Sequence, residues 1–331
     1  MDRPTMDDVA ARAGVSRALV SLALRGSPKV SARSRGAIMT AVDELDYRPN
    51  LVARQLASTR TRTIGVVVND LHNPFFPPVT DGVHNAAGDL DYRLLVSSAF
   101  RDHAVEEAAV DAFAGSGVEG IILVGTTMGQ GAIEHAATRV PLVVVTRPLR
   151  SSVVDTVNGD DPAGARLAVR HLLGLGHRRI AHVSGGAAAG APRRRAGYEQ
   201  AMIEAGLEPL VVEGSFTEAS GAAAATMLFE HHGDCTAVFA GNDLSALGAL
   251  DVIAGRGLDV PGDVSLCGYD NTFVAALRHI GLTTVDQRAE ELGRLAVEVL
   301  IERLEQGRTE ARHETMAPTL VVRDTTAVPR R

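Results

Sequence analysis

The sequence predicts two kinds of structure in one chain. An all-α helix-turn-helix domain with a short extra helix comes first, and an α/β domain of two lobes with parallel, doubly wound sheets follows. Short helical segments ended by glycine fill the first 46 residues, whereas runs of valine, isoleucine and leucine alternate with helical segments from residue 63 onward. Charge divides at the same place: residues 1–63 have a net charge of +5, and the remaining 268 have a net charge of −12. A basic N-terminus on an acidic protein indicates contact with a polyanion, although a solvated charged face gives the same count.

Length and composition describe an ordinary globular protein. The 331 residues are enough for two or three domains with their own cores, and 45% of them are hydrophobic. The two cysteines, Cys235 and Cys267, lie in apolar runs without the spacing of metal ligands, so we expect buried thiols and no metal site. No apolar run approaches 18 residues and the N-terminus lacks a signal-peptide core, which predicts a cytoplasmic protein without a membrane partner.

The first two helices have clear start and stop signals. Thr5 and Asp8 form a capping-box pattern at the start of segment 5–14, which ends in glycine. Ser16 then caps a second helix over 17–26, which also ends in glycine. The tight turn between them is typical of a helix-turn-helix module.

A third helix begins near Ser31, where Ile38, Val42 and Leu45 follow at helical spacing and brace the first two. In such modules the N-terminal part of the second helix enters the major groove of DNA. The residues expected at the DNA are Ser16, Arg17, Ala18, Ser21 and Leu22 on the second helix, with Arg33 and Arg35 at phosphates.

The residue types on the second helix suit base contacts. Arg17 can donate two hydrogen bonds to a guanine, while Ala18 and Leu22 can contact a thymine methyl group. Ser21 suits a phosphate. Lone exposed leucines are also common on protein surfaces, and helix pairs with small turns occur in structural bundles, so those alternatives stay open.

Residues 47–58, YRPNLVARQLAS, predict a helix of about two turns, with Asn50 as its cap and Val52 and Leu56 one turn apart. Such a short helix does not hold in water without a partner. No apolar segment lies beside it in the sequence, because STRTRT (58–63) follows. We therefore divide the chain into a DNA-binding domain (1–49), a segment of short helix and linker (50–62) and an α/β domain (63–331).

Several motifs together resemble the lactose-repressor (LacI/GalR) family of transcriptional regulators. The resemblance covers essentially the whole chain, in order, through DDVAARAGVS (7–16), VSARSRGAIMTAVDELDYRPN (30–50), VARQLAS (52–58), IGVVVNDLHNPFF (64–76), GHRRIAHVSG (176–185), AVFAGNDLSALGAL (237–250), DVPGDVSLCGYDN (259–271) and LTTVDQ (282–287). It implies that the short helix of segment 50–62 is a hinge helix, which packs against its own copy in a homodimer, inside the minor groove. Leu56 is then the wedge that partly unstacks a base step, with Asn50, Ala53 and Arg54 also at the DNA.

The α/β domain shows eight apparent strands in two sets of four. They cover 63–69, 93–99, 120–125, 141–146, 179–185, 209–216, 237–242 and 264–270. The resemblance implies the fold of periplasmic sugar-binding proteins, in which the chain crosses between the lobes three times. We expect lobe one at about 63–157 plus 288–316 and lobe two at about 158–287 plus 317–331.

Ligands of such folds bind at the carboxyl ends of strands, in the cleft between lobes. Polar residues at those ends are Asn69, Asp70, Thr146, Arg147, Asp160, Asn242, Asp243, Asp270 and Gln287. By resemblance, effector contacts fall on Arg194, Asn242, Asp270 and Gln287, with aromatic contacts from Phe75 and Phe216. The set expected at the effector is Phe75, Arg147, Asp160, Arg194, Phe216, Asn242, Asp270 and Gln287.

Two questions remain open about the residues near these strand ends and the cleft. Asp243 also suits a helix cap, and any one of Arg193, Arg194 and Arg195 can face the cleft. Planar Asp, Asn and Arg groups beside an aromatic ring indicate a sugar or nucleoside-like effector.

These features predict a sequence-specific transcriptional regulator, and we expect a repressor, that binds near-palindromic operator DNA under the control of this effector. The alternative is an α/β sugar- or nucleoside-processing enzyme with a DNA tether. No dinucleotide, phosphate-loop, nucleophile-elbow or zinc motif supports it, so we expect no catalytic residue and no cofactor. A sugar-transport protein does not fit the missing signal peptide and the basic N-terminus.

Overall fold

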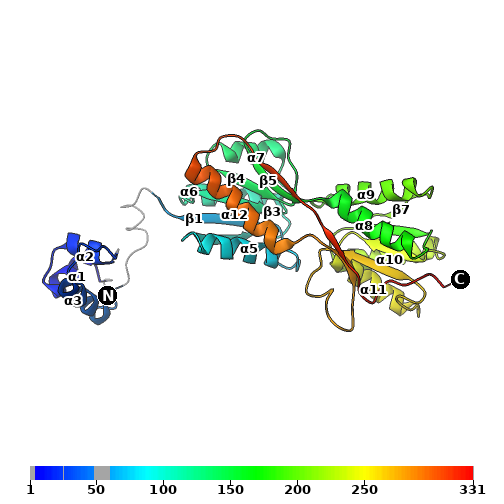
Figure 1. The fold of residues 1–331 in the computed structure, drawn as a ribbon, viewed down its shortest axis with the longest axis horizontal. Helices are drawn as coiled ribbons and strands as arrows, with labels where there is room; N and C mark the ends of the chain where they lie inside the picture. Colours follow the sequence, from blue (N-terminus) through cyan, green and yellow to red (C-terminus); the bar gives the residue numbers. More distant parts are fainter. Residues whose placement is uncertain (1–3, 25, 48–59, 331) are drawn as a thin grey trace. The chain divides into compact units, whose positions relative to one another are not determined.

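The computed structural model describes residues 4–24, 26–47 and 60–330. The chain divides into two compact units, Met1–Thr61 and Arg62–Arg331, which we call the head and the body (Figure 1). The predicted fold class is confirmed: a small all-α unit precedes a two-sheet α/β unit. No helix in these described ranges has the length and hydropathy needed to cross a lipid bilayer.

The head is a helix-turn-helix followed by a bracing helix. Its helices are α1 (Met6–Ala13), α2 (Arg17–Leu24) and α3 (Ala32–Glu44). The capping box at Thr5 is present, with the Thr5 side chain accepting from the Asp8 backbone N–H and the Asp8 carboxylate accepting from the Thr5 N–H. Val9, Val20 and Ile38, one from each helix, are fully buried together. A core this small is enough to hold the three helices in one arrangement.

The first lobe of the body is built on a six-stranded parallel sheet in the order β11-β5-β4-β3-β1-β2. The strands are β1 (Thr63–Val68), β2 (Arg93–Ser98), β3 (Gly120–Val124), β4 (Leu142–Val145), β5 (Asp155–Gly159) and β11 (His313–Met316). Helices cover both faces, α5 (Phe76–Gly88) and α12 (Ala289–Gln306) on one and α6 (His103–Gly115) and α7 (Gln130–Ala137) on the other. The central strands are therefore buried on both sides and consist almost wholly of apolar residues.

The second lobe repeats this plan with the order β12-β10-β9-β8-β6-β7, in which only β12 is antiparallel. Its strands are β6 (Ile180–Val183), β7 (Leu210–Val212), β8 (Ala237–Ala240), β9 (Ser265–Tyr269), β10 (Thr283–Asp286) and β12 (Thr319–Val321). Its helices are α8 (Asp161–Gly174), α9 (Ala191–Glu204), α10 (Glu218–His231) and α11 (Asp243–Gly255). One face of this sheet packs on α8 and α9, and the other packs on α10 and α11.

The sheets are larger than the predicted sets of four. The four additional strands are β5, β10, β11 and β12. All are short, and the first three are rich in polar residues, so their sequences do not predict buried strands. Strand β5 pairs with β4 and β11 in the first sheet, and the predicted lobe boundary at residue 157 falls inside it. Helix α12 packs in the first lobe, whereas β12 pairs with β10 in the second.

Candidate functional site

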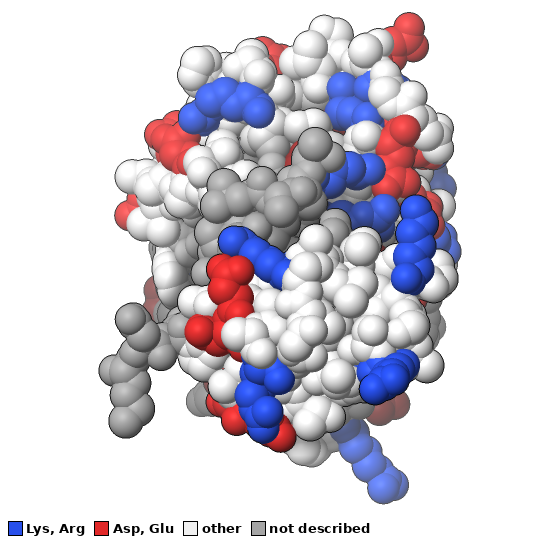
Figure 2. Space-filling model, turned by 90° about the vertical axis from the view of Figure 1, so that its left-hand side faces the viewer, with Lys and Arg blue, Asp and Glu red and all other residues white. Residues whose placement is uncertain are grey.

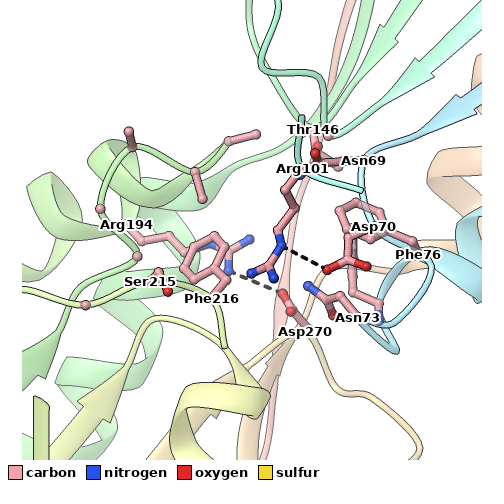
Figure 3. Close-up of a pocket in the computed structure, with 18 residues that line it drawn as sticks. Asn69, Asp70, Asn73, Phe76, Arg101, Thr146, Arg194, Ser215, Phe216 and Asp270 are labelled. Atoms are coloured by element: carbon pink, nitrogen blue, oxygen red, sulfur yellow. Dashed lines mark hydrogen bonds and ion pairs between the residues drawn. The ribbon is translucent and has the colours of Figure 1, made fainter. Parts of the chain in front are cut away.

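A cavity of about 200 Å³ lies between the lobes, where the carboxyl ends of strands from both sheets meet. This volume equals that of about seven water molecules, which suits one small ring compound. Its lining residues are Asn69, Asp70, Asn73, Phe75, Phe76, Arg101, Gly125, Thr146, Gly185 to Ala189, Arg194, Gly214, Ser215, Phe216 and Asp270. Arg194 and Phe216 of the second lobe face Asp70 and Phe76 of the first lobe across it (Figure 3).

Arg194 is the centre of the second-lobe wall. It lies on α9 and is 4% exposed, which resolves the choice among the three consecutive arginines. Its Nε donates to Asp161 Oδ1 at 3.0 Å, and its Nη1 donates to the Gly241 carbonyl at 2.7 Å and to Asp270 Oδ1 at 3.3 Å. The guanidinium also stacks 3.8 Å from the centroid of the Tyr269 ring. Acceptors and an aromatic face therefore hold the guanidinium in place at the cavity wall.

Two buried carboxyls share this one guanidinium. Burial raises the pKa of Asp270 to about 7, although the charge of Arg194 opposes the shift. Burial also raises the pKa of Asp161, again against Arg194. Burial thus makes this carboxyl easier to protonate than an exposed one, and a protonated carboxyl can donate a hydrogen bond as well as accept one. Such a group suits a ligand hydroxyl, which can both donate and accept.

An aromatic ring completes the second-lobe wall. Phe216 follows β7 and lies 4.9 Å from the guanidinium carbon of Arg194. The ring fits only because Gly185 has no side chain: a Cβ there would lie 2.0 Å from a ring carbon. Stacking a sugar or a base on such a ring is favourable because its face is apolar.

The first-lobe wall includes residues that sequence reasoning missed. Arg101, in the loop after β2, pairs through Nε with Asp70 Oδ2 at 3.2 Å (Figure 3). Asn73 also lines the cavity, and its side-chain oxygen accepts from the Phe75 N–H. The order of residues held no signal for Arg101, because it follows an ordinary strand and an exposed phenylalanine. In the second lobe, sequence reasoning also missed Asp161, the partner of Arg194, because acidic residues are common in the first turn of a helix.

Four predicted effector residues lie elsewhere than on the wall of this cavity. Arg147 donates to the carbonyls of Thr126 and Met128, so it braces a loop. Asp160 caps α8 through the Ala163 N–H.

The other two act beside the cavity. Asn242, fully buried, caps α11 and accepts from the Ser245 N–H; Asp243 is therefore not the cap, and it accepts from Thr272 and Thr284 instead. Gln287 donates to Asp270 Oδ1 at 2.6 Å and so orients a lining carboxyl from behind. Of the predicted set, Phe75, Arg194, Phe216 and Asp270 line the cavity directly.

The second candidate site is the exposed surface of α2. Arg17 and Ala18 are exposed, and Arg17 makes a surface ion pair with Asp7 at 3.4 Å in which both side chains are about two-thirds exposed. Such a pair is weak, so it leaves Arg17 available to a stronger partner. Ser16 is exposed and caps α2 through the Leu19 N–H at 3.2 Å. Figure 2 shows lysine and arginine side chains scattered over the face that it presents, with acidic side chains between them.

Two residues of the head differ from the prediction. Arg35 is half-buried and donates to the carbonyls of Ala23 and Ser27 at 3.2 and 2.7 Å, because the end of α2 leaves carbonyls without helical partners. It therefore supports the turn after α2 rather than standing free for a phosphate. Leu22 is half-buried against the head core, not fully outward. Arg33 is exposed, and Ser21 is half-buried. The predicted hinge contacts Asn50, Ala53, Arg54 and Leu56 lie outside the described residues.

Comparison with known proteins gives the same assignment along the chain. Residues 5–50 match the family described as bacterial regulatory proteins, lacI family, and residues 169–326 match the periplasmic binding protein-like domain. The HTH-type transcriptional repressor PurR of Vibrio campbellii is 35% identical over 327 residues, covering 97% of this chain and 98% of the relative.

Solved structures agree with this match. A complex of the transcriptional regulator CelR with cellobiose is 34% identical, with a TM-score of 0.75 over 98% of this chain and all of that one. The lac repressor dimer bound to operator and the anti-inducer ONPF is 30% identical, with a TM-score of 0.89 over 98% of this chain and all of that one. These relatives are transcriptional regulators, which favours regulation over catalysis. The chain belongs to the LacI family of bacterial transcriptional regulators.

Proposed function

We propose that this regulator binds a near-palindromic operator as a homodimer through α2, and that a neutral, hydroxyl-rich ring compound bound between the lobes controls its operator affinity. The observation that carries the effector class is the cavity wall itself. Its lining charges are two cations, Arg101 and Arg194, and two carboxyls, Asp70 and Asp270, so they balance. Paired charges and one exposed aromatic face suit a sugar or nucleoside better than a free phosphate or a cation.

The edge of the first sheet supports the homodimer. Within the described part of the chain, strand β2 pairs with β1 alone, and Leu95 and Val96 on it are 43% and 47% exposed. Phe100, just beyond its end, is 63% exposed. An exposed apolar edge strand is an unfavourable surface for a monomer, and a second copy of the chain covers it with the same residues.

A ligand screen tests the effector class. Sugars, nucleosides and polyols are added singly to the purified protein, and a shift in melting temperature identifies binders, because a ligand of the folded state stabilises it. We expect hits among neutral ring compounds with several hydroxyls. Hits confined to phosphorylated or cationic compounds contradict the proposed class.

Asp270→Asn keeps the size of the side chain but removes its charge. We expect a sugar or nucleoside hit from the screen to bind about 10- to 100-fold more weakly, since hydrogen bonds to charged groups contribute about 1.5–3 kcal/mol. Operator affinity without effector should stay near the wild-type value. Calorimetry that finds unchanged affinity for the hit removes Asp270 from the site.

On the DNA side, we expect Arg17→Ala to cost about 1–3 kcal/mol on the selected operator and to relax the preference at one base pair in each half-site. Arg33→Ala is the matched control for a phosphate contact, and it should weaken all sequences alike and reduce the salt dependence of binding. Titrations of both variants against operator and scrambled duplexes separate the two behaviours. If Arg17→Ala also weakens all sequences equally, Arg17 contacts the backbone and not a base.

A further inference from the structure

The chain enters the body at Arg62, and its side chain and backbone are both fixed there. The Arg62 N–H donates to Glu119 Oε1 at 2.7 Å, and Nη1 donates to the Leu90 carbonyl at 2.9 Å. The guanidinium carbon lies 5.5 Å from the centroid of the Tyr92 ring. The Tyr92 hydroxyl in turn lies 3.3 Å from Glu119 Oε2 and 3.4 Å from Glu305 Oε1. We call Arg62, Tyr92, Glu119 and Glu305 the entry clamp.

The backbone at the clamp is strained. Arg62 has φ = 44°, in the left-handed region that side chains other than glycine rarely adopt. A residue persists there only when its surroundings hold it, at a cost of about 1–3 kcal/mol. The contacts of the clamp thus determine the direction in which the chain leaves the body toward the linker.

One helix connects the clamp to the cavity. Glu305 lies in the last turn of α12, an 18-residue helix about 27 Å long. At the other end, Gln287 precedes α12 by two residues and donates to Asp270 of the cavity wall at 2.6 Å. A shift of Asp270 relative to the first lobe therefore acts on one end of α12, and the clamp lies at the other.

This helix packs directly against α5, beside which it lies in Figure 1. A Cβ at Gly82 of α5 would lie 1.9 Å from the Glu290 carbonyl oxygen, and one at Gly293 of α12 would lie 2.0 Å from the Val79 carbonyl oxygen. The two backbones are thus in direct contact. Helix α5 begins at Phe76, which lines the cavity, so the pair meets the cavity at one end as a unit.

We infer that the entry clamp is the positioning element through which the state of the cleft reaches the linker. The pair α5–α12 transmits a change in lobe angle to Glu305, and Glu305, Tyr92 and Glu119 transmit it to Arg62. The inference rests on the proposed function, because it concerns how operator binding and the cleft are linked. Linkage is reciprocal, so operator binding must also alter the cleft.

Hydrogen exchange tests this inference without an effector. The probe is an operator duplex selected from random sequences, added to saturation. The readout is amide exchange in residues 270–272 and 288–291, which line pockets between the lobes. We expect the duplex to change exchange in the wild type at least threefold. In Glu119→Ala and in Tyr92→Phe, with operator still saturating, the change should fall below 1.5-fold.

Two further variants distinguish positioning from general damage. Glu119→Gln keeps a carbonyl oxygen that can accept from the Arg62 N–H, and its amide N–H can donate to the Tyr92 hydroxyl oxygen, so it should restore the operator-induced change. Arg139→Ala, which removes a surface ion pair with Asp111 in the same lobe, should behave as the wild type.

Each outcome decides a separate point. A cleft that responds equally in the wild type and in both clamp variants overturns the inference, as does a wild-type cleft that does not respond to bound operator. A protein that selects no operator contradicts the proposed function instead.

Discussion

Arg194→Met should destabilise the body by about 3–5 kcal/mol at pH 8, because it leaves Asp161 and Asp270 buried without their counter-charge. Methionine fills similar space, so the lost charge and not a cavity dominates the effect. The free energy of unfolding, measured with urea, gives the size of the loss.

The loss should depend on pH in a specific direction. Burial already raises the pKa of both carboxyls, and without Arg194 both pKa values rise further. A carboxyl whose pKa is raised in the folded state stabilises the fold below its unfolded value near 4 and loses that contribution as the pH rises. The deficit of the variant should therefore be largest at pH 8 and smaller at pH 4.5.

Arg195→Met is the matched control on the same helix. Arg195 is 42% exposed and pairs with Glu199 and Glu213 on the surface, so its loss should cost about 1 kcal/mol or less, with little pH dependence between 5 and 8. Equal losses in both variants contradict the central role assigned to Arg194.

The second large effect concerns His182, which is fully buried between the rings of Tyr198 and Phe239, at centroid distances of 5.1 and 4.8 Å. Burial lowers its pKa to about 4 from an ordinary value of 6.5, although a hydrogen bond to the Phe239 carbonyl opposes this. The unfolded chain binds a proton below pH 6.5 and the folded chain does not, so this residue withdraws up to about 3 kcal/mol of stability as the pH falls from 6.5 to 4.

The wild-type curve alone does not reveal this effect, because Asp270 has the opposite dependence in nearly the same range. The difference between the wild type and His182→Phe does reveal it. We expect the difference in unfolding free energy to move by about 3 kcal/mol in favour of the variant between pH 7 and pH 4. The measurement is a urea titration of both proteins at pH 7 and at pH 4. A difference in unfolding free energy between the two proteins that is the same at both pH values would falsify the assignment.

An element can be predicted from the sequence when the residues that stabilise it lie near it in the chain. The head was predictable because its signals are local: Thr5, Asp8 and Gly14 specify where α1 begins and ends. The apolar strands were equally clear. Strand β5, with the sequence DTVNG, was not, because Asp155 is held by Arg303 and Arg308, about 150 residues away. The residues next to β5 in the sequence therefore do not show that it forms a strand.

The same distinction holds in the cavity. Strand ends identify Asp270 and Phe216 as neighbours of the cleft, since the carboxyl ends of parallel strands share one edge. They do not distinguish a lining group such as Asp270 from a helix cap such as Asn242, because both follow a strand and differ only in where the side chain turns. The Asp70–Arg101 pair also needed the structure, because it joins two loops.

The small side chains on the rim of the cavity affect how ligand recognition can change in this protein. Ala187, Ala188 and Ala189 line the cavity and are exposed or half-buried, outside both sheets. Larger side chains at these three positions can reach a bound ring without disturbing a buried strand. Recognition can therefore change there by single substitutions while folding is preserved. A laboratory search for biosensors with new specificities should begin at these three alanines rather than at Arg194, whose replacement should destabilise the body.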